Sequence, residues 1–236
     1  MTSKGKLYLI PNIISESTQE KVIPAMVREA LPDISHFLAE DIRTARRFLS
    51  SLKIYSTIEA LHFKVLNKDT SASELSELMA PLNEGFNVGV ISESGCPGVA
   101  DPGALAVQYA HQQNFQVVPL VGPSSILLAL MASGLNGQRF AFHGYLPIEA
   151  KEAAHNLKEL EKESRLKNQT QIFIETPYRN NSVFDYFLKN LHSETRLTIA
   201  LDLTGLNETV QTMRISDWVK LKPFWAKSPA VFLFLA

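Results

Sequence analysis

Cysteine is almost absent from this chain of 236 residues, in which Cys96 is the only one. A single cysteine cannot form an internal disulfide, which excludes the disulfide-stapled scaffolds of small secreted proteins. The six histidines are scattered along the sequence, and no group of histidine and cysteine has the spacing of a metal site. We therefore expect no bound metal and a reducing compartment.

Long apolar runs are also missing. No run reaches the roughly 18 residues that are needed to cross a bilayer. The N-terminal sequence MTSKGKLYLIPN shows no apolar segment followed by a cleavage site. These absences argue against a membrane-spanning helix and predict a cytoplasmic protein with no membrane partner.

Neither sign of charge is in excess, since 23 basic residues stand against 24 acidic ones. A protein that binds long nucleic acid through many phosphates is usually visibly basic. Any nucleic-acid partner must therefore be held by a local patch or be presented within a larger particle. Hydrophobic residues, in contrast, make up 45% of the chain, enough to fill one large domain or two domains of roughly 110–120 residues.

In the first half of the chain, short apolar runs alternate with stretches of helical periodicity. Strands are expected at 6–13, 34–41, 86–92 and 115–121, and helices at 19–31, 42–52, 71–85 and 104–114. Within 19–31, Pro24 is expected near a kink or the first turn of a helix. Residues 54–70 show no clear pattern. Alternating strands and helices predict a mainly parallel α/β sheet with right-handed crossovers.

The second half begins with an apolar helix at 122–135 and then becomes richer in strands. Strands are expected at 139–147, 170–179, 195–203, 208–216 and 229–236, and helices at 150–166 and 216–221. Consecutive strands near the end predict a mixed sheet. The change in composition after Val121 places a domain boundary there, with an N-terminal α/β domain at 1–121 and a C-terminal α/β domain at 122–236.

Glycine is scarce but concentrated. Nine of the eleven glycines lie between positions 85 and 144, and the segment SESGCPGVADPG (92–103) holds three of them. Glycine permits tight turns and close backbone approach, and ligands of open α/β sheets bind beyond the carboxyl ends of the strands. The loops after Ile91 and Val121 are therefore candidate binding loops, although they can also be read simply as efficient turns.

These loops match no common nucleotide-binding or nucleophile motif. The chain has no G-x-G-x-x-G after its first strand, no G-x-x-x-x-G-K-[ST] and no G-x-S-x-G. Ser124 and Ser125 stand at the start of an apolar helix. They either cap this helix or face a ligand together with its N-terminus.

Four segments, in order along the chain, resemble one family. They are LAEDIRTARRFL (38–49), GVISESGCPGVADPG (89–103), VVPLVGPSSILLALMASGLNGQRFAFHGYLP (117–147) and FIETPYRN (173–180). The tetrapyrrole-methylase superfamily shows the similar elements AEDTR, SDAGTPGISDPG, PGPSA…SGLP…GFLP and YE[SA]P[HY]R. The chain is most similar to the branch that methylates a cytidine ribose 2′-hydroxyl in small-subunit ribosomal RNA.

This resemblance implies two α/β domains with S-adenosylmethionine bound in the cleft between them. It also implies a homodimer and, as partner, ribosomal RNA or the small ribosomal subunit. A sulfonium methyl group is already electrophilic, so catalysis consists of in-line positioning and removal of the hydroxyl proton. Such a reaction needs no metal.

The resemblance also assigns roles to individual residues. Cofactor binding falls to Pro11, Asn12, Val99, Ala100, Asp101, Ala104, Ser124, Ser125, Glu175 and Leu203. Substrate binding falls to Glu40, Arg43 and Arg46, and proton acceptance to Asp41 or Glu93. Each role has an alternative in the residues themselves.

Three of these alternatives are structural. Asp101 can stabilise a turn before Pro102. Glu175 can be a capping or ion-paired acid at a strand end. The arginines Arg43, Arg46 and Arg47 can form a solvated helix face.

The chain departs from the family pattern at several positions. Its first loop reads IPNIIS where the family has TPIGN, and SESGCP replaces SDAGTP. Leu201 and Gly205 stand where the family element RELTK has basic residues. These departures leave two further hypotheses open: a tetrapyrrole or other small-molecule methyl acceptor, and a degenerate relative that binds the cofactor without catalysis.

Overall fold

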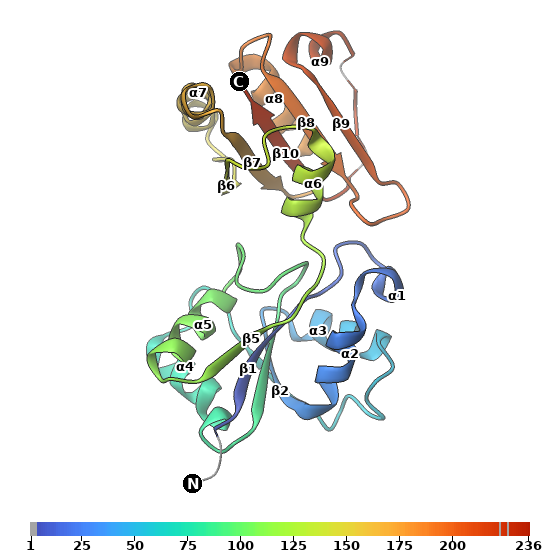
Figure 1. Cartoon of the computed structure of the whole chain (residues 1–236), viewed down its shortest axis with the longest axis vertical. Helices are drawn as coiled ribbons and strands as arrows, with labels where there is room; N and C mark the ends of the chain where they lie inside the picture. Colours follow the sequence, from blue (N-terminus) through green and yellow to red (C-terminus); the bar gives the residue numbers. More distant parts are fainter. Residues whose placement is uncertain (1–3, 222, 226) are drawn as a thin grey trace. The chain divides into compact units, whose positions relative to one another are not determined.

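The structure is a computed structural model that describes residues 4–221, 223–225 and 227–236. The chain divides into two compact units, Met1–Ser124 and Ser125–Ala236 (Figure 1). The sequence had placed the division three residues earlier, after Val121. Each unit is built on its own five-stranded sheet.

The first unit contains a parallel sheet in the order β3-β2-β4-β1-β5. Its strands are β1 (Lys6–Ile10), β2 (Ile34–Ala39), β3 (His62–Val65), β4 (Asn87–Ile91) and β5 (Gln116–Pro119). Parallel strands need crossover connections, and here helices supply most of them. They are α1 (Gln19–Val22), α2 (Ala25–Ala30), α3 (Ile42–Ser51), α4 (Ala72–Met79) and α5 (Gly103–Gln112), with short 3₁₀ turns at Leu31–Asp33 and Ala80–Leu82.

Alternation of side chains along the strands gives this sheet two apolar faces. On β2, Phe37 packs with α2 and α3, whereas its neighbour Leu38 packs with α4 and α5. On β4, Ile91 and Val90 divide between the same two clusters. Figure 1 accordingly shows α2 and α3 on one side of the sheet and α4 and α5 on the other. A sheet covered on both faces is typical of parallel α/β proteins.

The second unit contains a mixed sheet in the order β6-β7-β10-β8-β9. Its strands are β6 (Phe140–Tyr145), β7 (Thr170–Glu175), β8 (Arg196–Leu201), β9 (Thr209–Arg214) and β10 (Ala230–Leu235). The pair β6–β7 is parallel, and the other three pairs are antiparallel. The helices are α6 (Ser125–Ser133), α7 (Ala150–Lys167), α8 (Asn180–Asn190) and α9 (Ile215–Leu221).

Two clusters also cover the faces of the second sheet. One joins α7, α8 and α9 to an aromatic-rich face that includes Phe173, Phe232 and Phe234, and the other packs α6 against residues such as Val231 and Leu233. The strand β10 is buried along its whole length. This explains why AVFLFL is uninterruptedly apolar rather than alternating.

The predicted fold class of two α/β domains, one parallel and one mixed, is confirmed. One expected helix is divided at its proline, and one helix was not expected. The helix expected at 19–31 is interrupted at Pro24, whose extended backbone (φ −64°, ψ 156°) ends one helix and starts α2. The helix α8 was not predicted, although its buried residues Val183, Phe184 and Phe187 have helical spacing. Among the described residues, each helix is too short or too polar to cross a bilayer.

Candidate functional site

The carboxyl edge of the first sheet gathers most of the predicted site. Because β1, β2, β4 and β5 are parallel, the segments that follow them leave the sheet at the same edge. The first three segments start with Pro11–Asn12, Glu40–Asp41 and Ser92–Glu93, and the fourth, after β5, runs from Leu120 to Ser124. The fold thus brings together residues that lie up to about a hundred positions apart in the sequence.

Asn12 joins the loop after β1 to the loop after β4. Its side chain is 2% exposed, and its Nδ2 donates to the carbonyl oxygens of Ser92 (2.9 Å) and Glu93 (3.2 Å). Its Oδ1 accepts from the backbone N–H of Ile13 at 2.8 Å, and its own N–H donates to Gly95 O at 2.8 Å. With this polar side chain fully engaged, Asn12 sets the relative position of the two loops.

Asp101 organises the glycine-rich loop at 92–103. Its Oδ1 accepts backbone hydrogen bonds from Gly98 (2.6 Å) and Gly103 (2.8 Å). Ala100 lies in the left-handed region with φ 58°, which is uncommon for a residue other than glycine. Burial raises the pKa of Asp101, while the two amides act in the opposite direction. Asp101 therefore stabilises this turn through its two hydrogen bonds with backbone amides. Val99, in the same turn, is 49% exposed.

Three carboxylates, Glu40, Asp41 and Glu93, lie at this edge, and two of them have opposite electrostatic environments. Asp41 is the N-cap of α3, where its side chain accepts from the backbone N–H of Arg43 (2.7 Å) and Thr44 (3.3 Å). These amides lower the pKa of Asp41. Partial burial, and then the nearby charges of Glu40 and Asp41, raise the pKa of Glu93. Of the two predicted proton acceptors, Glu93 is thus the more basic.

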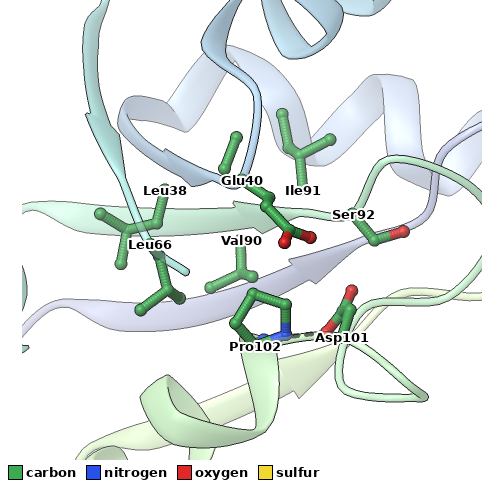
Figure 2. Close-up of a pocket in the computed structure, with 10 residues that line it drawn as sticks. Leu38, Glu40, Leu66, Val90, Ile91, Ser92, Asp101 and Pro102 are labelled. Carbon is green, nitrogen blue, oxygen red and sulfur yellow. Dashed lines mark hydrogen bonds between the residues drawn. The ribbon is translucent and has the colours of Figure 1, made fainter. Parts of the chain in front are cut away.

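A small pocket opens between β2, β4 and the start of α5 (Figure 2). Leu38, Leu66 and Val90 form its apolar part, and Glu40, Ser92 and Asp101 supply its polar groups. The hydroxyl of Ser92 is already used, since it donates to Ser94 O at 2.7 Å. Ser92 was not among the predicted site residues, although its place directly after an expected strand was a signal in the sequence.

The predicted cationic stripe on α3 is partly engaged with its own unit. The Arg46 guanidinium lies over the Phe63 ring at 5.1 Å. Arg43 and Arg47 have side chains 95% and 73% exposed and contact carboxylates only at 3.8 and 3.9 Å. Exposed pairs of this length contribute little, so both arginines are open to another anion.

Cys96 behaves as a loop-packing residue. Its Sγ lies 3.4 Å from Pro123 O, and burial, with the Asp101 charge second, raises the pKa of the thiol. A raised pKa disfavours the reactive thiolate. Gly122, near the end of the same segment, leaves no room for a side chain, because a Cβ there would collide with the ring of Pro11.

In the second unit, one edge of the sheet collects the predicted residues Glu175 and Leu203. Ala230 pairs with both Glu175 and Leu201, and Leu201 pairs with Thr209, so these residues form a row across the sheet. The loops that carry residues 176–179 and 202–208 leave from this row. Leu203 is 5% exposed. The sequence placed both residues on strand ends, but only the antiparallel register brings them to one edge.

Glu175 forms a buried ion pair with Arg179. The side chain of Glu175 is 1% exposed, and its Oε2 lies 3.1 Å from Arg179 Nη1. Its Oε1 accepts from the Thr176 N–H at 2.7 Å. Arg179 also donates to the carbonyl oxygens of Leu146 (3.3 Å) and Pro147 (3.3 Å). The pair therefore ties the loop after β6 to the loop after β7.

Gly205 stands where the family has a basic residue, and its backbone lies against the side chain of Asp202. A Cβ at this position would collide with the carboxylate of Asp202. That carboxylate accepts from the Asn207 N–H at 2.9 Å, and the Gly205 N–H donates to Asp202 O at 2.8 Å. A side chain at this position would therefore require the Asp202 carboxylate to move away from its present hydrogen bond with Asn207.

The described residues contain no group of three or more histidine, cysteine, aspartate or glutamate side chains that could hold a metal ion. Ser125 begins α6, and Ser124 directly precedes it. Val99, Ala100 and Ala104 are exposed beside the pocket-lining Asp101. This arrangement offers a small-residue surface with backbone groups rather than a ring of charged ligands.

Comparison with known proteins agrees with these features. The chain is 31% identical over 222 residues to "Ribosomal RNA small subunit methyltransferase I" of Escherichia coli O157:H7, covering 92% of this chain and 73% of that protein. The protein of the same name from Vibrio cholerae is 30% identical over 213 residues, covering 90% and 70%. The chain belongs to the ribosomal RNA small subunit methyltransferase I family. No protein-family model matches it.

The fold has a solved counterpart outside this methyltransferase family. The crystal structure of uroporphyrin-III-C-methyltransferase from Thermus thermophilus superposes with a TM-score of 0.57 at 17% identity, covering 98% of this chain and 92% of that one. At this identity the likeness concerns the fold alone. Together with the family membership, it confirms the resemblance to the tetrapyrrole-methylase superfamily and to its ribosomal RNA branch.

Proposed function

We propose that the protein is an S-adenosylmethionine-dependent methyltransferase that acts on a ribose 2′-hydroxyl of small-subunit ribosomal RNA. Membership of the methyltransferase family supports the reaction class. The observation that carries the proposal is the carboxyl edge of the first sheet, where a carboxylate of raised pKa, Glu93, lies beside an exposed, small-residue loop at 98–104.

The cofactor-binding residues fall into two groups. The first group belongs to the first unit and contains Pro11, Asn12, Val99, Ala100, Asp101, Ala104 and Ser124. The second group belongs to the second unit and contains Ser125, Glu175 and Leu203. The residues of the second unit fit a ligand with polar atoms. The sheet edge that carries Glu175 and Leu203 also carries the Thr204 hydroxyl oxygen, which is buried and has no hydrogen-bond partner. A neutral cofactor portion with several polar atoms suits such a surface.

S-adenosylmethionine supplies an electrophilic methyl group when bound. The chain's own residues position the acceptor and receive its proton. We assign the proton to Glu93, whose raised pKa makes it the stronger base, and assign Asp41 to the positioning of α3 through its N-cap. With the cofactor bound, the methyl carbon would exchange its bond to sulfur for a bond to the acceptor oxygen, S-adenosylhomocysteine would be the leaving group, and the Glu93 carboxylate would take up the proton of the acceptor hydroxyl.

Arg43 and Arg47 are assigned to phosphates of the substrate, because their guanidinium groups are exposed and weakly paired. Arg46 is assigned to the same surface, held there by Phe63. Glu40 lines the pocket beside it. A local patch of this kind is compatible with the balanced charge of the chain, because a ribosomal particle presents the RNA. A homodimer in the cytoplasm is part of the same proposal.

The test is to incubate the full chain with radiolabelled S-adenosylmethionine and small ribosomal subunits that lack the modification. Label in RNA, mapped to a ribose 2′-oxygen, is the expected result. Glu93→Gln should lose at least about 100-fold in rate, in line with the usual contribution of general base catalysis, whereas Asp41→Asn should lose less. Label in a porphyrinoid instead of RNA, or binding of the cofactor without transfer, would contradict the proposal.

A further inference from the structure

Thr204 combines two unusual features in the loop after β8. Its backbone lies in the left-handed region with φ 70°, where a β-branched residue is a genuine outlier. Its Oγ1 is buried and has no hydrogen-bond partner. Buried polar groups are nearly always paired, so a hydroxyl that is neither paired nor solvated needs an explanation.

The loop does not need this hydroxyl for its own shape. Glu208 Oε2 accepts from the Thr204 N–H at 2.6 Å. Asp202 accepts from Gly205 and Asn207, and its own N–H donates to Pro229 O at 3.1 Å. These hydrogen bonds already define the turn, and none of them uses the Thr204 hydroxyl.

The location of Thr204 points to a ligand. In the described part of the chain, two buried side-chain oxygens at one edge of the second sheet, those of Asn180 and Thr204, have no partner, whereas the Glu175 carboxylate beside them is paired with Arg179. Asn180 Nδ2 donates to Ser228 O and Asp202 N–H to Pro229 O, so both segments flank the start of β10. Two unpaired polar atoms thus lie at the sheet edge that carries the proposed cofactor residues Glu175 and Leu203.

We propose that Thr204 is a further ligand-binding residue, whose hydroxyl bonds a polar atom in the nucleoside half of S-adenosylmethionine. This inference rests on the proposed function. Thr204 is only partly buried as a residue, and a rotation of about 120° between two staggered χ1 rotamers exchanges the hydroxyl with the methyl group. A threonine hydroxyl can donate or accept, which matches the ring nitrogens and hydroxyls of a nucleoside. Binding then supplies the missing partner.

The experiment measures, by calorimetry, the affinity of the full-length chain for S-adenosylmethionine and for the product S-adenosylhomocysteine, which has the same nucleoside. Thr204→Val has nearly the same shape but no hydroxyl, and Thr204→Ser keeps the hydroxyl. We expect Thr204→Val to weaken both ligands about 10-fold and Thr204→Ser to stay within about threefold of wild type. The melting temperature of ligand-free Thr204→Val should equal or exceed that of wild type, because removing an unpaired buried hydroxyl is neutral or stabilising.

Two results would overturn the inference. Unchanged affinity of Thr204→Val for both ligands would show that the hydroxyl does not reach the nucleoside. A lower melting temperature of ligand-free Thr204→Val would show that the hydroxyl has a structural partner in the resting protein. Absence of binding by the wild-type chain would refute the proposed function as well, and is distinguishable because it precedes any comparison of variants.

Discussion

Replacing Asn12 by alanine should destabilise the first unit by about 2–4 kcal/mol. The change removes three side-chain hydrogen bonds, to Ser92 O, Glu93 O and the Ile13 N–H. Each such bond contributes about 0.5–1.5 kcal/mol net, and buried groups left unpaired add to the cost. The site is 2% exposed, so water cannot easily replace the lost amide.

The assay is urea unfolding followed by far-UV circular dichroism, with Asn83→Ala, at an exposed position of the same unit, as the matched control. Asn12→Asp should be at least as damaging as Asn12→Ala. A carboxylate there would face the carbonyl oxygens that now accept from Nδ2. The control should stay within about 0.5 kcal/mol of wild type.

Asn12→Ala should also weaken cofactor binding, because Asn12 holds the loop after β1 against the loop that carries Glu93. If the stability of Asn12→Ala changed by less than about 0.5 kcal/mol, the hydrogen bonds that we assign to Asn12 would not form in solution. If the stability fell as expected and cofactor affinity did not, the joined loops would not be part of the site.

Four further predictions concern other residues of the molecule. Gly122→Ala should lower the free energy of unfolding by about 1–3 kcal/mol, because the added methyl group would overpack against Pro11. The control in the same urea assay is Gly137→Ala, where a Cβ meets nothing within 4 Å. Glu175→Gln should lower the free energy of unfolding by about 3 kcal/mol, because the Arg179 guanidinium loses its carboxylate. The double variant with Arg179→Met should lose less free energy than the two single variants together. Additive effects would contradict a coupled pair. The methyl-transfer rate should rise with pH through an ionisation above the ordinary glutamate pKa, because Glu93 must be ionised to accept the proton and its pKa is raised. For the same reason Glu93→Gln should stabilise the fold at neutral pH, since the stability contributed by a carboxyl of raised folded-state pKa is lost as pH increases through that pKa; a destabilised Glu93→Gln would refute the assignment.

Several elements could be predicted because local chemistry determines them. Ser71 forms a capping box with Glu74 at the start of α4, and the apolar run AVFLFL becomes the fully buried β10. The position of the glycine-rich loop followed from its place after a strand. In each case the deciding interactions lie within a few residues, so the sequence pattern contains them.

Other features depend on groups that are far apart in the chain. Asp41 and Glu93 looked equivalent as proton acceptors, and they differ because the amides of α3 lower the pKa of Asp41 while burial and neighbouring carboxylates raise that of Glu93. Glu175 looked like a possible cofactor contact, and in the structure its carboxylate is paired with Arg179. These differences arise from partners that the linear order does not reveal.

The amino-acid sequence by itself determined the fold class, the family and the loops that bear the site, because strand and helix periodicity and ordered motifs are local properties. Only the tertiary structure decided which carboxylate is more basic, that Glu175 pairs with Arg179, and where a hydroxyl such as that of Thr204 is left unpaired. Burial, charge proximity and hydrogen-bond satisfaction depend on distances through space, and these exist only once the parallel and antiparallel registers of the two sheets have formed.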